Sequence, residues 1–143
     1  MKEFFLILFF SQWVALTPQP IDISHEIVLS PDKPLTAITG GAGVHIDLSN
    51  AAPAVGIKQT GIEESMRILH EMIPPDSVSG YLLTGEGQRI LLDRAFFSLE
   101  NDRAWMVLTS SSGIPTGPEF VTLSIRSSVE IRGVSVYWKN YRH

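Results

Sequence analysis

The segment from His45 to Ser49 is where polar side chains recur at a spacing that could build a reactive site. His45 and Asp47 are two positions apart in an alternating stretch, so they share one face of the strand predicted there. An imidazole and a carboxylate could both bind a metal ion, but such a site needs at least one more ligand from elsewhere in the chain. We therefore keep His45 and Asp47 as weak metal candidates, predict no cofactor, and favour a polar stripe that faces solvent.

Other candidate catalytic patterns are weaker. The glycine run at 40–43 is followed by Val44 and His45, where a phosphate-binding loop would need a lysine and a hydroxyl residue. Two carboxylates could act as the acid pair of a glycosidase, but ordinary surface solvation explains every acidic residue in the chain. An enzyme therefore stays an open alternative, and we favour a protein without catalytic activity.

Aromatic side chains are the better candidates for function, and they indicate binding. Tyr137 lies opposite the apolar face of its predicted strand, Tyr141 follows it, and Trp105 could belong either to the core or to a binding surface. Flat exposed rings stack on sugars and on partner surfaces, and they contribute much of the energy of many binding sites. We predict Tyr137, Tyr141 and Trp105 as ligand-binding residues, whereas Trp138 continues the apolar face of its strand and is predicted to be buried.

The strands that must position these residues are clearest in the last quarter of the chain. Apolar and polar residues alternate from 120 to 126 and again from 129 to 139, with Ser127 and Ser128 between the two stretches. Alternation of β-branched and aromatic residues is typical of strands with one buried face. We expect two paired strands joined by a polar break.

The preceding residues predict further strands and one helix. Strands are expected at 25–30, 35–39, 44–49, 78–84, 88–93, 96–99 and 104–109, which gives about eight in all. The connection at 85–87 contains two glycines and predicts a hairpin. A helix is expected at 61–73, with Thr60 and Glu63 as a capping box and Pro74 ending it. Ile62, Met66, Leu69 and Ile73 recur at helical spacing and form its predicted apolar face.

These elements predict an all-β protein, an antiparallel β-sandwich with one short α-helix. The stretch from Gly80 to Asp93, together with the closing residues Val134 to Trp138, resembles the galactose-binding-type jelly rolls of exported modules, which often end in paired strands carrying an aromatic residue. The resemblance implies a jelly-roll arrangement of the strands, and no binding residue is transferred from it.

Composition limits the class of partner. The chain has 143 residues, a net charge of -4 and no cysteine. The length suits one domain with a core of its own, and the absence of cysteine excludes disulfides and thiolate chemistry. Nucleic-acid binding relies on clustered Lys and Arg, which the sequence lacks, so we expect no nucleic-acid partner.

The N-terminal residues predict targeting. Lys2 precedes an apolar run from Phe4 to Phe10, and small residues follow near Ala15 and Thr17. This order is typical of a secretory signal peptide, so we divide the chain into a signal peptide or anchor at 1–17 and a β-sandwich domain at 18–143. The alternative is an apolar strand or helix packed against the domain. A membrane contact is expected only through this segment.

Three functions are compatible with the sequence. We favour an exported, periplasmic or extracellular, binding module without catalytic activity, whose ligand is a carbohydrate or another protein. The first alternative is a structural subunit of an envelope or surface assembly, which would retain its N-terminal segment and could be anchored by it. The second alternative is a small hydrolase.

Overall fold

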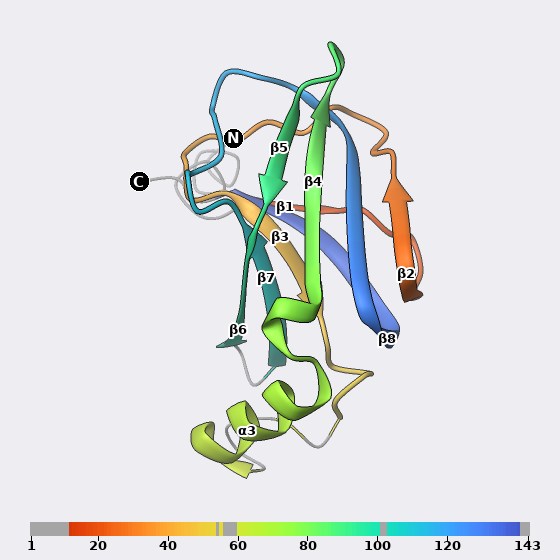
Figure 1. Ribbon diagram of the computed structural model, residues 1–143, viewed down its shortest axis with the longest axis vertical. Helices are drawn as coiled ribbons and strands as arrows, with labels where there is room; N and C mark the ends of the chain where they lie inside the picture. Colours follow the sequence, from red (N-terminus) through yellow and green to blue (C-terminus); the bar gives the residue numbers. More distant parts are fainter. Residues whose placement is uncertain (1–11, 54, 56–59, 101–102, 141–143) are drawn as a thin grey trace, which may run out of the picture.

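The computed structural model describes residues 12–53, 55, 60–100 and 103–140, and most of them lie in antiparallel strands (Figure 1). The strands are β1 (Gln12–Ala15), β2 (Ile21–Leu29), β3 (Gly43–Asp47), β4 (Val78–Thr84), β5 (Arg89–Leu92), β6 (Arg94–Glu100), β7 (Arg103–Thr109) and β8 (Phe120–Asn140). The helices are α3 (Ile62–Met72) and the short 3-10 helix η1 (Pro75–Ser77). The expected all-β class with one short α-helix is confirmed.

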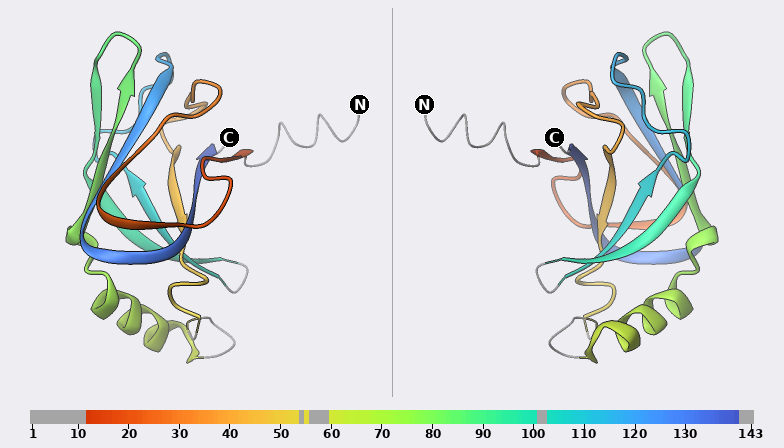
Figure 2. Two further views of the ribbon diagram at one scale, coloured as in Figure 1. Left: turned by 90° about the vertical axis from the view of Figure 1, so that its right-hand side faces the viewer. Right: turned by 90° about the vertical axis from the view of Figure 1, so that its left-hand side faces the viewer.

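Strand β8 organises the sheet. The strands follow the order β5-β4-β8-β3-β7-β6, and β1 and β2 also pair with β8. The first part of β8 pairs with β2 and β4, and its last part pairs with β1 and β3. We call the first part of β8 together with β2, β4 and β5 sheet B. We call the last part of β8 together with β1, β3, β6 and β7 sheet A. Figure 2 shows β8 curving from one half to the other. Strands β5 and β6 stand at the two ends of this order, and only Asp93 separates them in the chain. The sheet is therefore nearly closed and barrel-like.

The core fills the space between the two halves. Its fully buried members include Val44, Ile46, Leu82, Met106, Leu123, Ile125, Val134 and Val136. They occupy alternate positions of their strands, as the period of two requires. Trp138 is also buried, and its indole Nε1 donates a hydrogen bond to the carbonyl oxygen of Thr36 at 3.1 Å, so its predicted place in the core is confirmed.

The predicted break at Ser127 is a bend within one continuous strand of 21 residues, so the expectation of two separate strands is wrong. The Ser127 hydroxyl donates to the carbonyl oxygen of Val129 at 2.6 Å and accepts from the Val129 amide at 3.3 Å. Such local side-chain bonds compete with the backbone ladder. Along its length β8 curves from sheet B to sheet A (Figure 2), which lets one strand serve both sheets.

The single α-helix, α3, lies at one end of the sheet (Figure 1). Leu69 and the following Ile73 are buried, as predicted, whereas Ile62 is exposed. The capping box is wrong: Gly61 is the N-cap residue, and the Thr60 hydroxyl instead bonds to the hydroxyl of Ser65 at 2.7 Å. The buried Ser65 explains this, because its hydroxyl needs a partner inside the fold.

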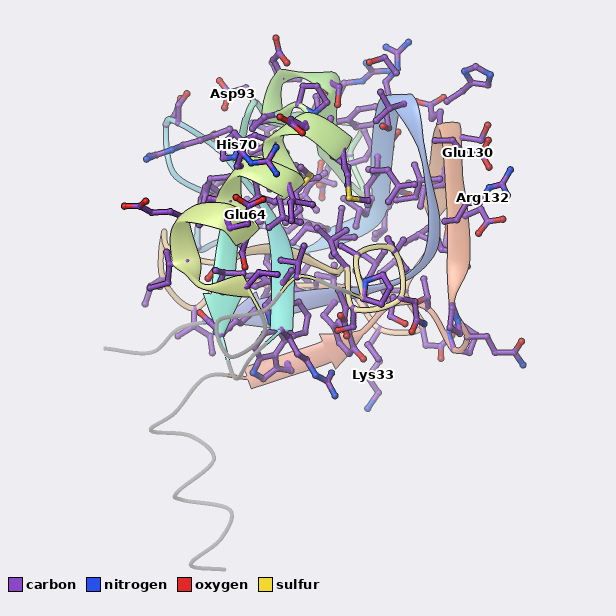
Figure 3. The ribbon with its side chains drawn as sticks, turned by 90° about the horizontal axis from the view of Figure 1, so that it is seen from below. Lys33, Glu64, His70, Asp93, Glu130 and Arg132 are labelled. Atoms are coloured by element: carbon purple, nitrogen blue, oxygen red, sulfur yellow. The ribbon has the colours of Figure 1, made fainter. Side chains whose placement is uncertain are left out.

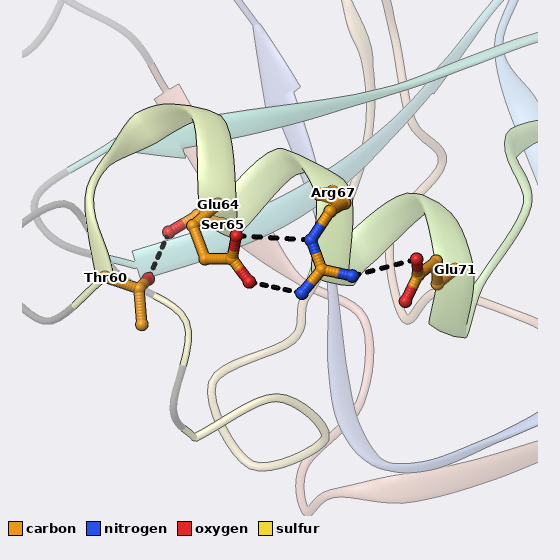
Figure 4. Close-up of polar contacts among 5 residues, drawn as sticks. All are labelled: Thr60, Glu64, Ser65, Arg67 and Glu71. Atoms are coloured by element: carbon orange, nitrogen blue, oxygen red, sulfur yellow. Dashed lines mark hydrogen bonds and ion pairs between the residues drawn. The ribbon is translucent and has the colours of Figure 1, made fainter.

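The outer side of α3 is charged. Arg67 forms ion pairs with Glu64 and Glu71, and all three side chains are about half exposed or more (Figure 4). His70 is exposed, as expected, and lies on the same helix as Glu64 in the view of Figure 3. Among the described residues, no helix is long and apolar enough to cross a membrane.

Strand β1 falls inside the segment predicted as a signal peptide or anchor. It pairs with the end of β8, from Gln12 opposite Asn140 to Ala15 opposite Tyr137. The pairing continues past β1, because the Leu16 amide donates to the carbonyl oxygen of Val136 at 2.8 Å. Residues 12–16 are therefore part of the sheet in this structure, while residues 1–11 lie outside the described part.

Candidate ligand-binding site

One row of side chains crosses the outer face of sheet A from β8 to β6. Tyr137 is opposite His45, His45 is opposite Val107, and Val107 is opposite Phe96. Cross-strand partners point to the same side of a sheet, so these four side chains are neighbours. Their flanking residues, such as Val44 and Val136, face the core. The row therefore lies on the side away from the core.

An aromatic cluster covers one end of this row. We define the aromatic cluster as Trp13, His45, Trp105 and Tyr137. The ring centroid of Trp13 is 5.2 Å from those of His45 and Trp105 and 5.9 Å from that of Tyr137. These separations and the tilted or edge-on geometries are those that aromatic pairs prefer. Because Trp13 comes from β1, the N-terminal strand completes the cluster.

An ion pair lies over the aromatic cluster. The Lys139 ammonium is 3.4 Å from a carboxylate oxygen of Glu100 and 4.4 Å from the ring centroid of Trp13. Lys139 is buried although its side chain is charged. An ammonium over an indole face is attracted by the ring quadrupole, and the carboxylate compensates its charge. Lys139 thus ties β1 to β6 across the outer face.

His45 is neutral at physiological pH. The pKa of His45 falls from 6.5 to about 4, chiefly because of burial and also because of the charge of Lys139; a hydrogen bond to the Gly43 backbone and the charge of Glu100 oppose the fall. Burial disfavours the imidazolium because the cation loses its hydration. The ring therefore serves as a packed aromatic member of the cluster.

The solvent-facing stripe expected at His45 and Asp47 is wrong for His45, which is only 3% exposed. The side chain of Trp13, which belongs to the N-terminal strand β1, packs against the His45 ring and covers it. Asp47 accepts hydrogen bonds from the Ser49 amide and hydroxyl and pairs with Arg103 at 3.2 Å. Among the described residues, no three His, Asp or Glu side chains form a metal-binding group.

A groove of about 420 Å³ opens beside the aromatic cluster on the same face. Strands β3, β6 and β7 form its floor, and the loops at 40–41 and 110–113 form its rim. It is lined by Gly40, Gly41, His45, Arg94, Phe96, Ser98, Glu100, Val107, Thr109, Ser110, Ser111 and Gly113. The volume falls in the range of small-molecule sites. The floor combines the apolar Phe96 and Val107 with hydroxyl groups and with the charged Arg94 and Glu100.

Side-chain hydrogen bonds fix the rim of the groove. Asp93 accepts from the Ser111 amide at 2.9 Å and from the Ser111 hydroxyl at 2.8 Å, and these bonds lower the pKa of its carboxyl group. On the other side, the Thr109 hydroxyl donates to the carbonyl oxygen of Ala42 at 3.3 Å. Both loops are thus held against the strands, which presents a preformed site to a ligand.

Phe96 is the most exposed ring that lines the groove. Its side chain is 41% exposed, and the guanidinium of Arg94 lies 5.8 Å from the ring centroid. Neighbouring residues in a strand face opposite sides, so Phe97 points to the core while Phe96 points outward. An exposed ring beside a cation is a surface suited to stacking.

The structure brings two of the three predicted binding residues together. The ring centroids of Tyr137 and Trp105 are 5.8 Å apart in the aromatic cluster. Tyr137 is half-buried there, and Trp105 is 8% exposed. Neither residue lines the groove; both belong to the aromatic cluster beside it. Tyr141 lies outside the described residues. The sequence analysis missed Phe96, although two consecutive phenylalanines in a strand require one of them to face outward.

A second hollow, of about 350 Å³, lies on sheet B between β2, η1 and the bend of β8. Two carboxylates, those of Glu26 and Asp76, line it together with His25 and Arg126. Glu26 accepts a hydrogen bond from the Ser124 hydroxyl at 2.8 Å. All the residues that line this hollow are polar or charged, and none is a Phe, Tyr or Trp, which makes the groove on sheet A the better candidate site.

Comparison of the chain with known protein families, curated proteins and solved structures found no match.

Proposed function

We propose that the protein is an exported binding module, without catalytic activity, that holds a carbohydrate in the groove on the outer face of sheet A. The observation that carries the proposal is the position of Phe96 in a groove whose rim is held in place. The ring offers a flat apolar face to the C–H face of a sugar, and Ser98, Thr109 and Ser110 line the same groove with their hydroxyl groups.

The export part of the proposal depends on the apolar run from Phe4 to Phe10, which has the length and position of a signal-peptide core. Intact mass of the protein recovered from its native host tests it. Loss of about 15 to 17 residues supports export with processing. A full-length mass contradicts removal of the segment.

The jelly-roll arrangement that the closing strands resemble belongs to the same proposal. What supports it is the mostly antiparallel, barrel-like sheet with aromatic residues near the end of β8.

A glycan array with the purified protein tests carbohydrate binding. The decisive variant is Phe96→Ala, with Leu91→Ala as its control, because Leu91 is also a large apolar side chain, is 61% exposed on the preceding strand β5 and lies outside the groove. We expect Phe96→Ala to weaken binding at least about tenfold, since such rings are often hot spots, and Leu91→Ala to bind as the wild type does. An empty array, or equal effects of the two variants, would contradict the proposal.

A structural subunit of a surface assembly is the second candidate, and one observation favours it. Strand β1 belongs to the sheet, and Trp13 completes the aromatic cluster, so the fold uses residues that export with cleavage would remove. A mature protein that retains residues 1–17 and forms concentration-dependent oligomers would support this function. A processed monomer would exclude it.

A further inference from the structure

The charges around the groove suggest which sugars it would hold. Lys139 is compensated by Glu100 at 3.4 Å, and His45 is uncharged at neutral pH. The carboxylate of Asp93, which accepts hydrogen bonds from the Ser111 amide and hydroxyl, stays charged but does not line the groove. Of the charged groups that line the groove, this leaves the guanidinium of Arg94.

Arg94 is placed to bind an anion beside the ring. Among the described residues, no carboxylate forms an ion pair with Arg94. Its guanidinium stands 5.8 Å from the centroid of Phe96, so a group that binds Arg94 adjoins whatever stacks on the ring. A planar guanidinium binds a carboxylate through two parallel hydrogen bonds, which neutral hydroxyl groups do not match in strength.

A sugar acid combines the two features that the groove offers. A uronic acid carries its carboxylate on the pyranose ring itself, next to the C–H face that stacks on an aromatic side chain. Resting on the carbohydrate binding proposed above, we infer that the ligand is an acidic sugar whose ring stacks on Phe96 and whose carboxylate pairs with Arg94. The partner is thus a polyuronate, free or in a cell-surface polymer.

Methyl esterification supplies a matched probe, because it masks the carboxylate and leaves the sugar unchanged. The experiment compares polygalacturonate, polyglucuronate and alginate with their methyl esters, by isothermal titration at neutral pH and moderate salt. The variants are Arg94→Gln and Arg94→Lys. The control is Arg89→Gln, because Arg89 also stacks on a ring, that of Tyr81 at 4.4 Å, but outside the groove.

We expect at least one acid to bind about tenfold or more tightly than its ester, as a charge-assisted pair predicts. Arg94→Gln should reduce the acid to the affinity of the ester, Arg94→Lys should retain part of the difference, and Arg89→Gln should change neither. Equal binding of acid and ester, or equal losses in the Arg94 and Arg89 variants, would overturn the inference. It also fails if every polyuronate is without measurable binding.

The same data separate this inference from the proposed function. If neutral glycans bind at least as tightly as the acids, and Phe96→Ala abolishes that binding, the module binds carbohydrate while the assignment of an acidic ligand is wrong. If neither acidic nor neutral glycans bind, both are wrong.

Discussion

Burial of His45 under Trp13 predicts how the stability of the fold depends on pH. The pKa of His45 falls from 6.5 to about 4 in the folded protein. Between these values the unfolded chain takes up a proton that the folded protein does not, so the free energy of unfolding falls as the solution becomes more acid. Over this pH range the free energy of unfolding changes by about 1.4 kcal/mol per pH unit, which gives a total of about 3 kcal/mol.

The sign follows from which state binds the proton. Above pH 6.5 His45 is neutral in both states, and its contribution to stability is fully present; as the pH falls toward 4 that contribution is lost. His45→Gln removes the titrating group. The variant also loses packing, but that loss lowers its free energy of unfolding by the same amount at every pH. The difference in slope between the two proteins therefore measures proton binding by His45 alone.

Urea unfolding of the wild type and of His45→Gln, from about pH 7.5 to about pH 4, measures this difference. Below pH 6.5 the free energy of unfolding of the wild type should fall more steeply than that of His45→Gln, by about 1 kcal/mol per pH unit. In a parallel NMR titration the ring resonances of His45 should have a midpoint of about 4. Curves of equal slope, or a midpoint near 6.5, would refute the burial of His45 and with it the cover provided by Trp13.

Four further substitutions test the packing and the exposed ion pairs, each measured by denaturant unfolding. Gly80→Ala should cost on the order of 2–3 kcal/mol, because a Cβ there would overlap the backbone carbonyl oxygen of Ser124, whereas Gly117→Ala, which meets nothing, should leave stability unchanged. Leu82→Ala should cost about 2–5 kcal/mol, since the side chain is completely buried; a smaller loss would mean that β4 packs loosely. Arg67→Ala should leave the unfolding midpoint where it is despite two ion pairs, because the pairs are exposed, and a clear loss would contradict that reasoning.

Most of the predicted strands are confirmed, because alternation reports which face of a strand is buried. The strand expected at 35–39 is wrong: only Leu35 pairs there, in an isolated bridge with Phe120. Trp138 was expected to continue the apolar face of its strand, and it is buried together with Val134 and Val136. Alternation does not report which strands are neighbours. The sharing of β8 between two sheets was therefore not foreseen, and its bend at Ser127 was interpreted as the end of a strand.

The site was harder to predict for a physical reason. His45 lies on the outward face of β3, and its burial comes from Trp13, more than thirty residues away in a segment interpreted as a signal peptide. No local pattern contains that contact. Phe96 differs, because its neighbour Phe97 already forces one of the two rings outward, so its exposure could have been predicted.

The position of β8 in the chain has a consequence for biosynthesis. Strands β1, β2, β3 and β4 all pair with β8, yet β8 follows every other strand in the order of synthesis. On the ribosome, the earlier strands have only the β4–β5, β6–β7 and β3–β7 pairings available to them. Such long-range pairings are slow to form, and the two halves of the sheet can join only when residues 120–140 have been made. The sheet therefore cannot close until residues 120–140 have left the ribosome.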